Sequence, residues 1–142
     1  MNEISLVIMA AGLGSRFGAP KQLVPVGPEN EIFLDYAVKA AIEVEIKKVV
    51  IVTRSVLNEQ LKEHLAQYQQ SGLLIEMVNQ DTFEPKREKP WGTGHAVVTA
   101  LDRTDGSIIV MNADDYYGPT ALRQILQGFD GETPAILAFR LK

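Results

Sequence analysis

The chain has 142 residues, of which 46% are hydrophobic and 23% charged, values typical of a single globular domain with a sizeable core. Its formal net charge of −4 disfavours bulk binding to nucleic acid or to an anionic membrane, so a phosphate ligand would need a local cluster of cations. The absence of cysteine excludes disulfides and thiolate metal sites, and the sequence shows neither a secretory signal nor a membrane-spanning stretch, so we expect a soluble, cytoplasmic protein.

The hydrophobic pattern predicts strands and helices in steady alternation. The expected strands are 5–10, 48–53, 73–78, 107–111 and 133–141, and the expected helices are 33–44, 57–68, 96–101 and 119–128. Near-continuous apolar strands are typical of a parallel sheet that is covered on both faces. We therefore predict an α/β fold, a Rossmann-like doubly wound three-layer sandwich with a mostly parallel sheet.

The expected topology indicates where a ligand binds. If right-handed crossovers give the strand order 3-2-1-4, the order reverses between strands 5–10 and 107–111. The loops that follow these two strands, 12–21 and 112–118, would then lie side by side. Ligands of doubly wound folds bind at this point, so we expect the functional site there.

The first of these loops has the composition of an anion site. It contains three glycines within the seven residues 12–18, which let the backbone turn sharply and expose consecutive N–H groups. Ser15, Arg16 and Lys21 bring a hydroxyl and two positive charges to the same loop. The second loop holds Asp114 and Asp115, so phosphates together with a divalent metal would be a natural occupant.

Three motifs in this order resemble those of the sugar-phosphate nucleotidyltransferases. Residues 10–23 read A-A-G-L-G-S-R-F-G-A-P-K-Q-L and resemble the family signature A-A-G-x-G-(S/T)-R…P-K. Gln80 followed by the G-T-G-H-A of 92–96 resembles the segment with which N-acetylglucosamine-1-phosphate uridylyltransferases contact the nucleobase. Asp114 after an apolar strand resembles the aspartate that holds the catalytic magnesium in the family.

The resemblance implies a fold of the nucleotide-diphospho-sugar transferase type and an activity. The activity would be Mg²⁺-dependent nucleotidyl transfer from a nucleoside triphosphate, with UTP favoured, to a sugar 1-phosphate, giving an NDP-sugar and pyrophosphate. Arg16, Lys21 and Asp114 would be catalytic, with Asp114 as the metal ligand. The nucleotide would be bound by Ala10, Ala11, Gly12, Leu13, Gly14, Ser15, Arg16, Lys21, Gln80, Gly92 and Thr93.

Several alternatives remain open at this stage. An NADP-binding dehydrogenase half would explain the first two glycines of the loop, and a non-catalytic nucleotide-binding domain would keep the cradle without the reaction. Asp114 and Asp115 could instead cap the following helix, and Asp115 could replace Asp114 as the metal ligand. His95 is assigned to structure or to a ribose contact.

Catalytic domains of the resembling family continue well beyond this length. We therefore expect residues 1–142 to form a single nucleotide-binding domain that is incomplete, truncated at its C-terminus and able to bind nucleotide without necessarily catalysing transfer. The acceptor sugar cannot be read from the sequence. Strand 133–141 would have an unpaired edge, which predicts self-association.

Overall fold

The computed structural model describes residues 3–12, 14–16, 19–84, 91–138 and 140. The strands are β1 (Ile4–Met9), β2 (Ser15–Arg16), β3 (Ala19–Pro20), β4 (Lys48–Thr53), β5 (Leu74–Asn79) and β6 (Ser107–Asn112). The helices are α1 (Phe33–Glu43), α2 (Asn58–Leu65), α3 (Thr93–Leu101) and α4 (Ala121–Gly128), with short 3-10 turns at Lys21–Leu23, Ser55–Leu57 and Ala66–Tyr68. Among the described residues, no helix is both long and apolar enough to cross a membrane.

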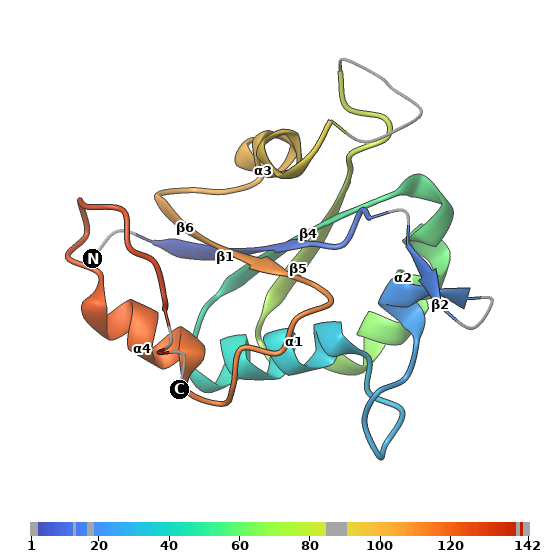
Figure 1. Ribbon diagram of the computed structural model, residues 1–142, viewed down its shortest axis with the longest axis horizontal. Helices are drawn as coiled ribbons and strands as arrows, with labels where there is room; N and C mark the ends of the chain where they lie inside the picture. Colours follow the sequence, from blue (N-terminus) through green and yellow to red (C-terminus); the bar gives the residue numbers. More distant parts are fainter. Residues whose placement is uncertain (1–2, 13, 17–18, 85–90, 139, 141–142) are drawn as a thin grey trace.

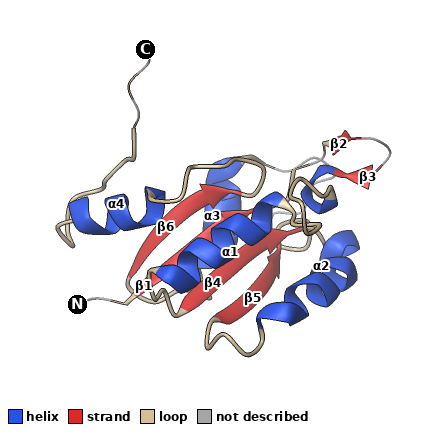
Figure 2. Cartoon of the chain, turned by 90° about the horizontal axis from the view of Figure 1, so that it is seen from below, coloured by secondary structure: helices blue, strands red, loops and turns tan. Residues whose placement is uncertain are grey.

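Four strands form the central sheet in the order β5-β4-β1-β6, and every neighbouring pair is parallel. Helix α3 covers one face, whereas α1 and α2 cover the other (Figure 1). Helix α4 lies beside the β6 edge, on the same side of the sheet as α1 (Figure 2). This arrangement confirms the predicted α/β fold and the predicted strand order.

Strand β1 lies between two other strands, and its side chains are buried on both faces of the sheet. Leu6 and Ile8 belong to the larger core, which is shared with α1 and α2, and Val7 belongs to the core under α3. All three are fully buried. β4 repeats the alternation, since Val49 and Ile51 face the first core while Val50 and Val52 face the second. Runs of consecutive apolar residues, 6–9 in β1 and 49–52 in β4, therefore fit the interior of a sheet that is covered on both faces.

The predicted fifth strand is wrong for the part of it that the structure describes. Residues 133–138 form no strand, and β6 has no second neighbour among the described residues. The apolar alternation of this segment predicts a strand, but a strand also needs a partner for its backbone N–H and C=O groups. Self-association therefore remains a prediction, and among the described residues the edge strands of the central sheet are β5 and β6.

A buried carboxylate joins α1 to the segment around α2. Asp35 accepts hydrogen bonds from the Ile32 N–H at 2.8 Å, from the Tyr68 hydroxyl at 2.6 Å and from His64 Nε2 at 2.8 Å. Burial, followed by the contact with Asp35, raises the pKa of Tyr68 well above its usual value, so the phenol stays protonated and donates. The buried Asp35 carboxylate thus accepts hydrogen bonds from the backbone of residue 32 and from the side chains of His64 and Tyr68.

We predict that Asp35→Ala lowers the free energy of unfolding by about 2 to 4 kcal/mol, because it leaves buried donors without their acceptor. Urea unfolding followed by circular dichroism measures the change. Glu63→Ala removes an exposed carboxylate from α2 and serves as the control, with an expected change within about 0.5 kcal/mol. Equal stabilities of the two variants would contradict the structural role of Asp35.

Candidate active site

A cavity of about 220 Å³ lies at the carboxyl ends of the central strands. The loop after β1, the start of α3 and the loop after β6 contribute its walls. Its lining residues are Met9, Ala10, Ala11, Gly12, Lys21, Gln22, Gln80, Gly92, Thr93, Ala96, Asn112, Ala113 and Asp114. The two loops that the topology predicts to be neighbours therefore border one cavity.

Lys21 and Asp114 form an ion pair across this cavity. Lys21 Nζ lies 2.6 Å from Asp114 Oδ2, although the two residues are 93 positions apart in the sequence. The hairpin β2–β3 turns the chain back toward β1, and the Lys21 N–H donates to the Gly14 carbonyl at 3.3 Å. The cavity thus holds a cation and a carboxylate at hydrogen-bonding distance.

Two glycines allow the Lys21 side chain to lie against the loop. A Cβ atom at Gly12 would lie 3.3 Å from Lys21 Cε, and one at Gly14 would lie 2.9 Å from Lys21 Cδ. The second distance is shorter than real Cβ contacts allow, so a side chain at Gly14 would push the lysine stem away. The absence of side chains at Gly12 and Gly14 therefore leaves room for the close approach of Lys21.

Gln22 is a cavity residue that the sequence reasoning missed. Its side chain is buried, and its Nε2 donates to the Gly12 carbonyl at 2.8 Å. This bond holds the glycine-rich loop in place next to Lys21. The residue lies within the recognised motif at 10–23, so its place directly after Lys21 is the signal that could have found it.

The loop after β6 separates its two aspartates. Asp114 lines the cavity, whereas Asp115 Oδ2 accepts from Asn112 Nδ2 at 2.8 Å within its own loop. The Asn112 N–H donates to the Tyr117 hydroxyl at 3.0 Å, which closes the loop. Burial, reinforced by the nearby carboxylates, raises the pKa of Tyr117. Of the two aspartates, Asp114 is the one that a ligand in the cavity can reach.

Gln80, Gly92 and Thr93 line the side of the cavity that faces α3. Gln80 is only 5% exposed. Its backbone N–H donates to the Thr53 carbonyl at 2.9 Å, and its side-chain Nε2 donates to the Gly92 carbonyl at 3.1 Å. Gly92 precedes the first turn of α3 with a φ of 107°, a conformation that favours glycine. The end of β5 is thereby tied to the start of α3.

The structure brings most of the predicted site residues together. Ala10 and Ala11 are buried at the end of β1, and Gly14 lies under Lys21. Ser15 and Arg16 form β2, but their side chains lie outside what the structure describes. Leu13 lies outside the described residues altogether. The other predicted residues, Gly12, Lys21, Gln80, Gly92, Thr93 and Asp114, line the same cavity.

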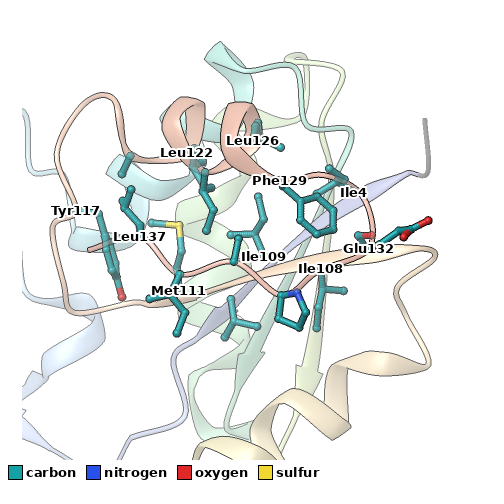
Figure 3. A pocket seen from close by; sticks show the side chains of 17 residues that line it. Ile4, Ile108, Ile109, Met111, Tyr117, Leu122, Leu126, Phe129, Glu132 and Leu137 are labelled. Carbon is teal, nitrogen blue, oxygen red and sulfur yellow. The ribbon is translucent and has the colours of Figure 1, made fainter. Parts of the chain in front are cut away.

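A second cavity of about 540 Å³ is larger but has the wrong chemistry for an anion. It lies between β6, α4 and the segment after α4, with Met111, Leu122 and Phe129 among the side chains that point into it (Figure 3). None of the described residues that line it is a lysine or arginine, and Glu132 adds a carboxylate. The cavity of about 220 Å³ is the candidate active site, because it lies at the carboxyl ends of the central strands and contains both Lys21 and Asp114.

Comparison with known proteins agrees with the motifs and the fold. The sequence profile of the MobA-like NTP transferase domain matches residues 6–141, which is nearly the whole chain. The chain belongs to this family. The resemblance inferred from the three motifs is thereby confirmed. No curated protein sequence matches the chain closely enough to count as a relative.

Solved structures share the fold of this MobA-like domain. A UDP-glucose pyrophosphorylase from Acinetobacter baumanii superimposes with a TM-score of 0.61 at 23% identity, over 90% of this chain and 53% of that one. A Mycobacterium tuberculosis H37Rv protein gives 0.63 at 22%, over 88% and 59%. A Bacillus anthracis protein assigned as a glucose-1-phosphate thymidylyltransferase, in complex with sucrose, gives 0.67 at 20%, over 87% and 50%. The chain thus spans between 50% and 59% of the length of these structures.

We predict that Lys21→Met changes the free energy of unfolding by no more than about 1 kcal/mol, because the Lys21–Asp114 pair is partly exposed, at 27% and 39%. Lys39→Met is the matched control, since it removes a pair with Glu31 at 3.3 Å whose members do not line the cavity. Urea unfolding of both variants checks this. A loss of several kcal/mol in Lys21→Met alone would mean that the ion pair maintains the fold.

Proposed function

We propose that this domain binds a nucleoside triphosphate and serves nucleotidyl transfer to a sugar 1-phosphate, with UTP as the donor. The observation that supports it best is the single cavity bordered by the glycine-rich loop, Lys21 and Asp114. The match to the MobA-like NTP transferase domain supports the reaction class. The names of two solved structures with the same fold, a UDP-glucose pyrophosphorylase and a glucose-1-phosphate thymidylyltransferase, support the substrate class.

The chemistry of the reaction suits such a site. An oxygen of the sugar phosphate attacks the α-phosphorus, the bond from that phosphorus to the bridging oxygen of the β-phosphate breaks, and pyrophosphate leaves. The nucleophile is already an anion, so no side chain has to remove a proton. The reaction needs alignment of two anions and neutralisation of the charge that builds at the α-phosphate.

The chain's own groups can meet these needs. In our proposal the backbone N–H groups at 12–15 bind the phosphates, as consecutive N–H groups of a turn do at other anion sites. Lys21 leaves Asp114 and contacts the α-phosphate, and Arg16 neutralises the leaving pyrophosphate. Gln22 keeps the loop in shape through its bond to the Gly12 carbonyl.

Asp114 fits a magnesium ion that arrives with the nucleotide. Among the described residues, no group of three or more His, Cys, Asp or Glu side chains could hold a metal by itself. Mg²⁺ commonly takes one or two carboxylates together with substrate phosphates and waters, so one aspartate on the cavity wall is a suitable partner. The bound ion would neutralise phosphate charge and orient the α-phosphate.

The nucleobase is assigned to the side of the cavity formed by Gln80, Gly92 and Thr93. These residues correspond to the Q…G-T-G-H-A pattern, which resembles that of uridylyltransferases and favours UTP. Thr93 at the start of α3 adds a hydroxyl to the same wall. The acceptor sugar phosphate would approach from the open side of the cavity.

A thermal-shift panel with UTP, dTTP, CTP, ATP, GTP and NADPH, each with and without Mg²⁺, tests the proposal. We expect the largest rise in melting temperature with UTP and Mg²⁺, because a ligand at one hundred times its dissociation constant stabilises by about 2.7 kcal/mol, or several degrees for a domain of this size. A rise with NADPH alone would support a dehydrogenase half instead. No rise with any nucleoside triphosphate would contradict the proposal.

Two cavity variants should separate the phosphate and metal contributions. Lys21→Met should weaken UTP binding at least about tenfold, because a charge-assisted bond to phosphate is lost. Asp114→Asn should keep metal-free binding but lose the additional affinity that Mg²⁺ confers. Isothermal titration calorimetry measures both effects, with Lys39→Met and Asp105→Asn as controls outside the cavity. An Asp114→Asn variant with unchanged Mg²⁺ dependence would exclude Asp114 as the metal ligand.

A further inference from the structure

His95 contacts the cavity residue Gln80 without lining the cavity itself. Its Nδ1 lies 3.1 Å from Gln80 Nε2, and Gln80 is almost fully buried. The sequence assigned His95 to structure or to a ribose contact. In the structure it contacts the side chain that lines the cavity at the proposed nucleobase position.

The orientation of the Gln80 amide follows from its other partner. The Gly92 carbonyl can only accept, so the Gln80 atom 3.1 Å from it must be the nitrogen. The same nitrogen faces His95 Nδ1, and a hydrogen bond between them requires that Nδ1 accepts and that the ring proton sits on Nε2. Both N–H groups of the amide are then engaged. The carbonyl oxygen is the polar atom that Gln80 can still offer to a ligand.

Both partners of Gln80 are themselves held by α3. The Gly92 carbonyl also accepts the Ala96 N–H at 3.1 Å, which forms the first turn of the helix. The His95 ring packs edge-on against Phe83, with ring centroids 5.7 Å apart. Its Nε2 is buried without a hydrogen-bond partner among the described residues. The ring therefore has Gln80 as its polar contact within this part of the chain.

We propose that His95 is a positioning residue that strengthens the base preference by holding the Gln80 amide in place together with the Gly92 carbonyl. The inference rests on the proposed function, in which the nucleobase lies at Gln80. A carbonyl oxygen facing ring position N3 accepts the N3–H of uracil or thymine, whereas it meets the lone pair of cytosine at the same position. Without the Nδ1 acceptor, one amide N–H is released and only the Gly92 carbonyl still opposes a turn of the amide, so cytosine is rejected less strongly.

Two substitutions at one position test this role. His95→Phe keeps a ring beside Phe83 but removes the acceptor, whereas His95→Asn can place an amide oxygen where Nδ1 lies. Calorimetric titration with UTP and CTP in Mg²⁺ should show a UTP-to-CTP affinity ratio that falls about tenfold in His95→Phe and is largely kept in His95→Asn. Thermal unfolding of both variants checks that they fold.

A second measurement needs no nucleotide. Two-bond ¹H–¹⁵N correlation spectra of the ring-labelled free chain should show His95 protonated at Nε2 and unprotonated at Nδ1. A proton on Nδ1, or an unchanged UTP-to-CTP ratio in a folded His95→Phe variant that still binds UTP, would overturn the role of His95 alone. A wild-type chain that binds neither nucleotide would contradict the proposed function, while the tautomer is read independently of it.

Discussion

The site depends on strand β1, which is paired on both sides and buried on both faces. The chain leaves β1 over one face of the sheet, through α1, and returns to β6 from the other face, through α3. The loops at the carboxyl ends of β1 and β6 therefore start from adjacent strands and lead to opposite faces, which leaves a crevice between them. The residues that line the cavity of about 220 Å³ lie at this end of the sheet or at the start of α3.

The Lys21–Asp114 ion pair in this crevice contributes little to the stability of the fold, whereas each of its two charges can bind part of a ligand. A partly exposed pair such as Lys21–Asp114 contributes at most about 1 kcal/mol to stability. A bound nucleotide with its metal would supply each member with a new partner of opposite charge, phosphate for the lysine and a cation for the carboxylate. The two groups are thus held ready in the cavity without a buried, unpaired charge.

The sequence predicted the layers and the strand order because those depend on strong patterns, namely apolar runs and the handedness of crossovers. The hairpin β2–β3 escaped prediction because strands of two residues are too short to show a period. For segment 133–138 a strand was predicted that does not form, since the segment has no neighbouring strand to pair with among the described residues. An alternating apolar pattern favours a strand, but the strand also needs a neighbour that can accept its backbone hydrogen bonds.

The residues that line the cavity were easier to predict from the sequence than the hydrogen bonds that hold them in place. Motif spacing indicated Lys21, Gln80 and Asp114, which line one cavity, and also Arg16, whose side chain lies outside the described part of the chain. Spacing did not reveal that Gln22 bonds the Gly12 carbonyl or that His95 contacts Gln80, since those bonds depend on how β5, α3 and the first loop meet in space.

The central claim is that this cavity binds a nucleoside triphosphate, and a ¹⁵N NMR titration with UTP and Mg²⁺ tests it most directly. We expect saturable shifts concentrated at the amides of the cavity residues; shifts confined to the apolar cavity beside α4, or no shifts at all, would contradict the claim.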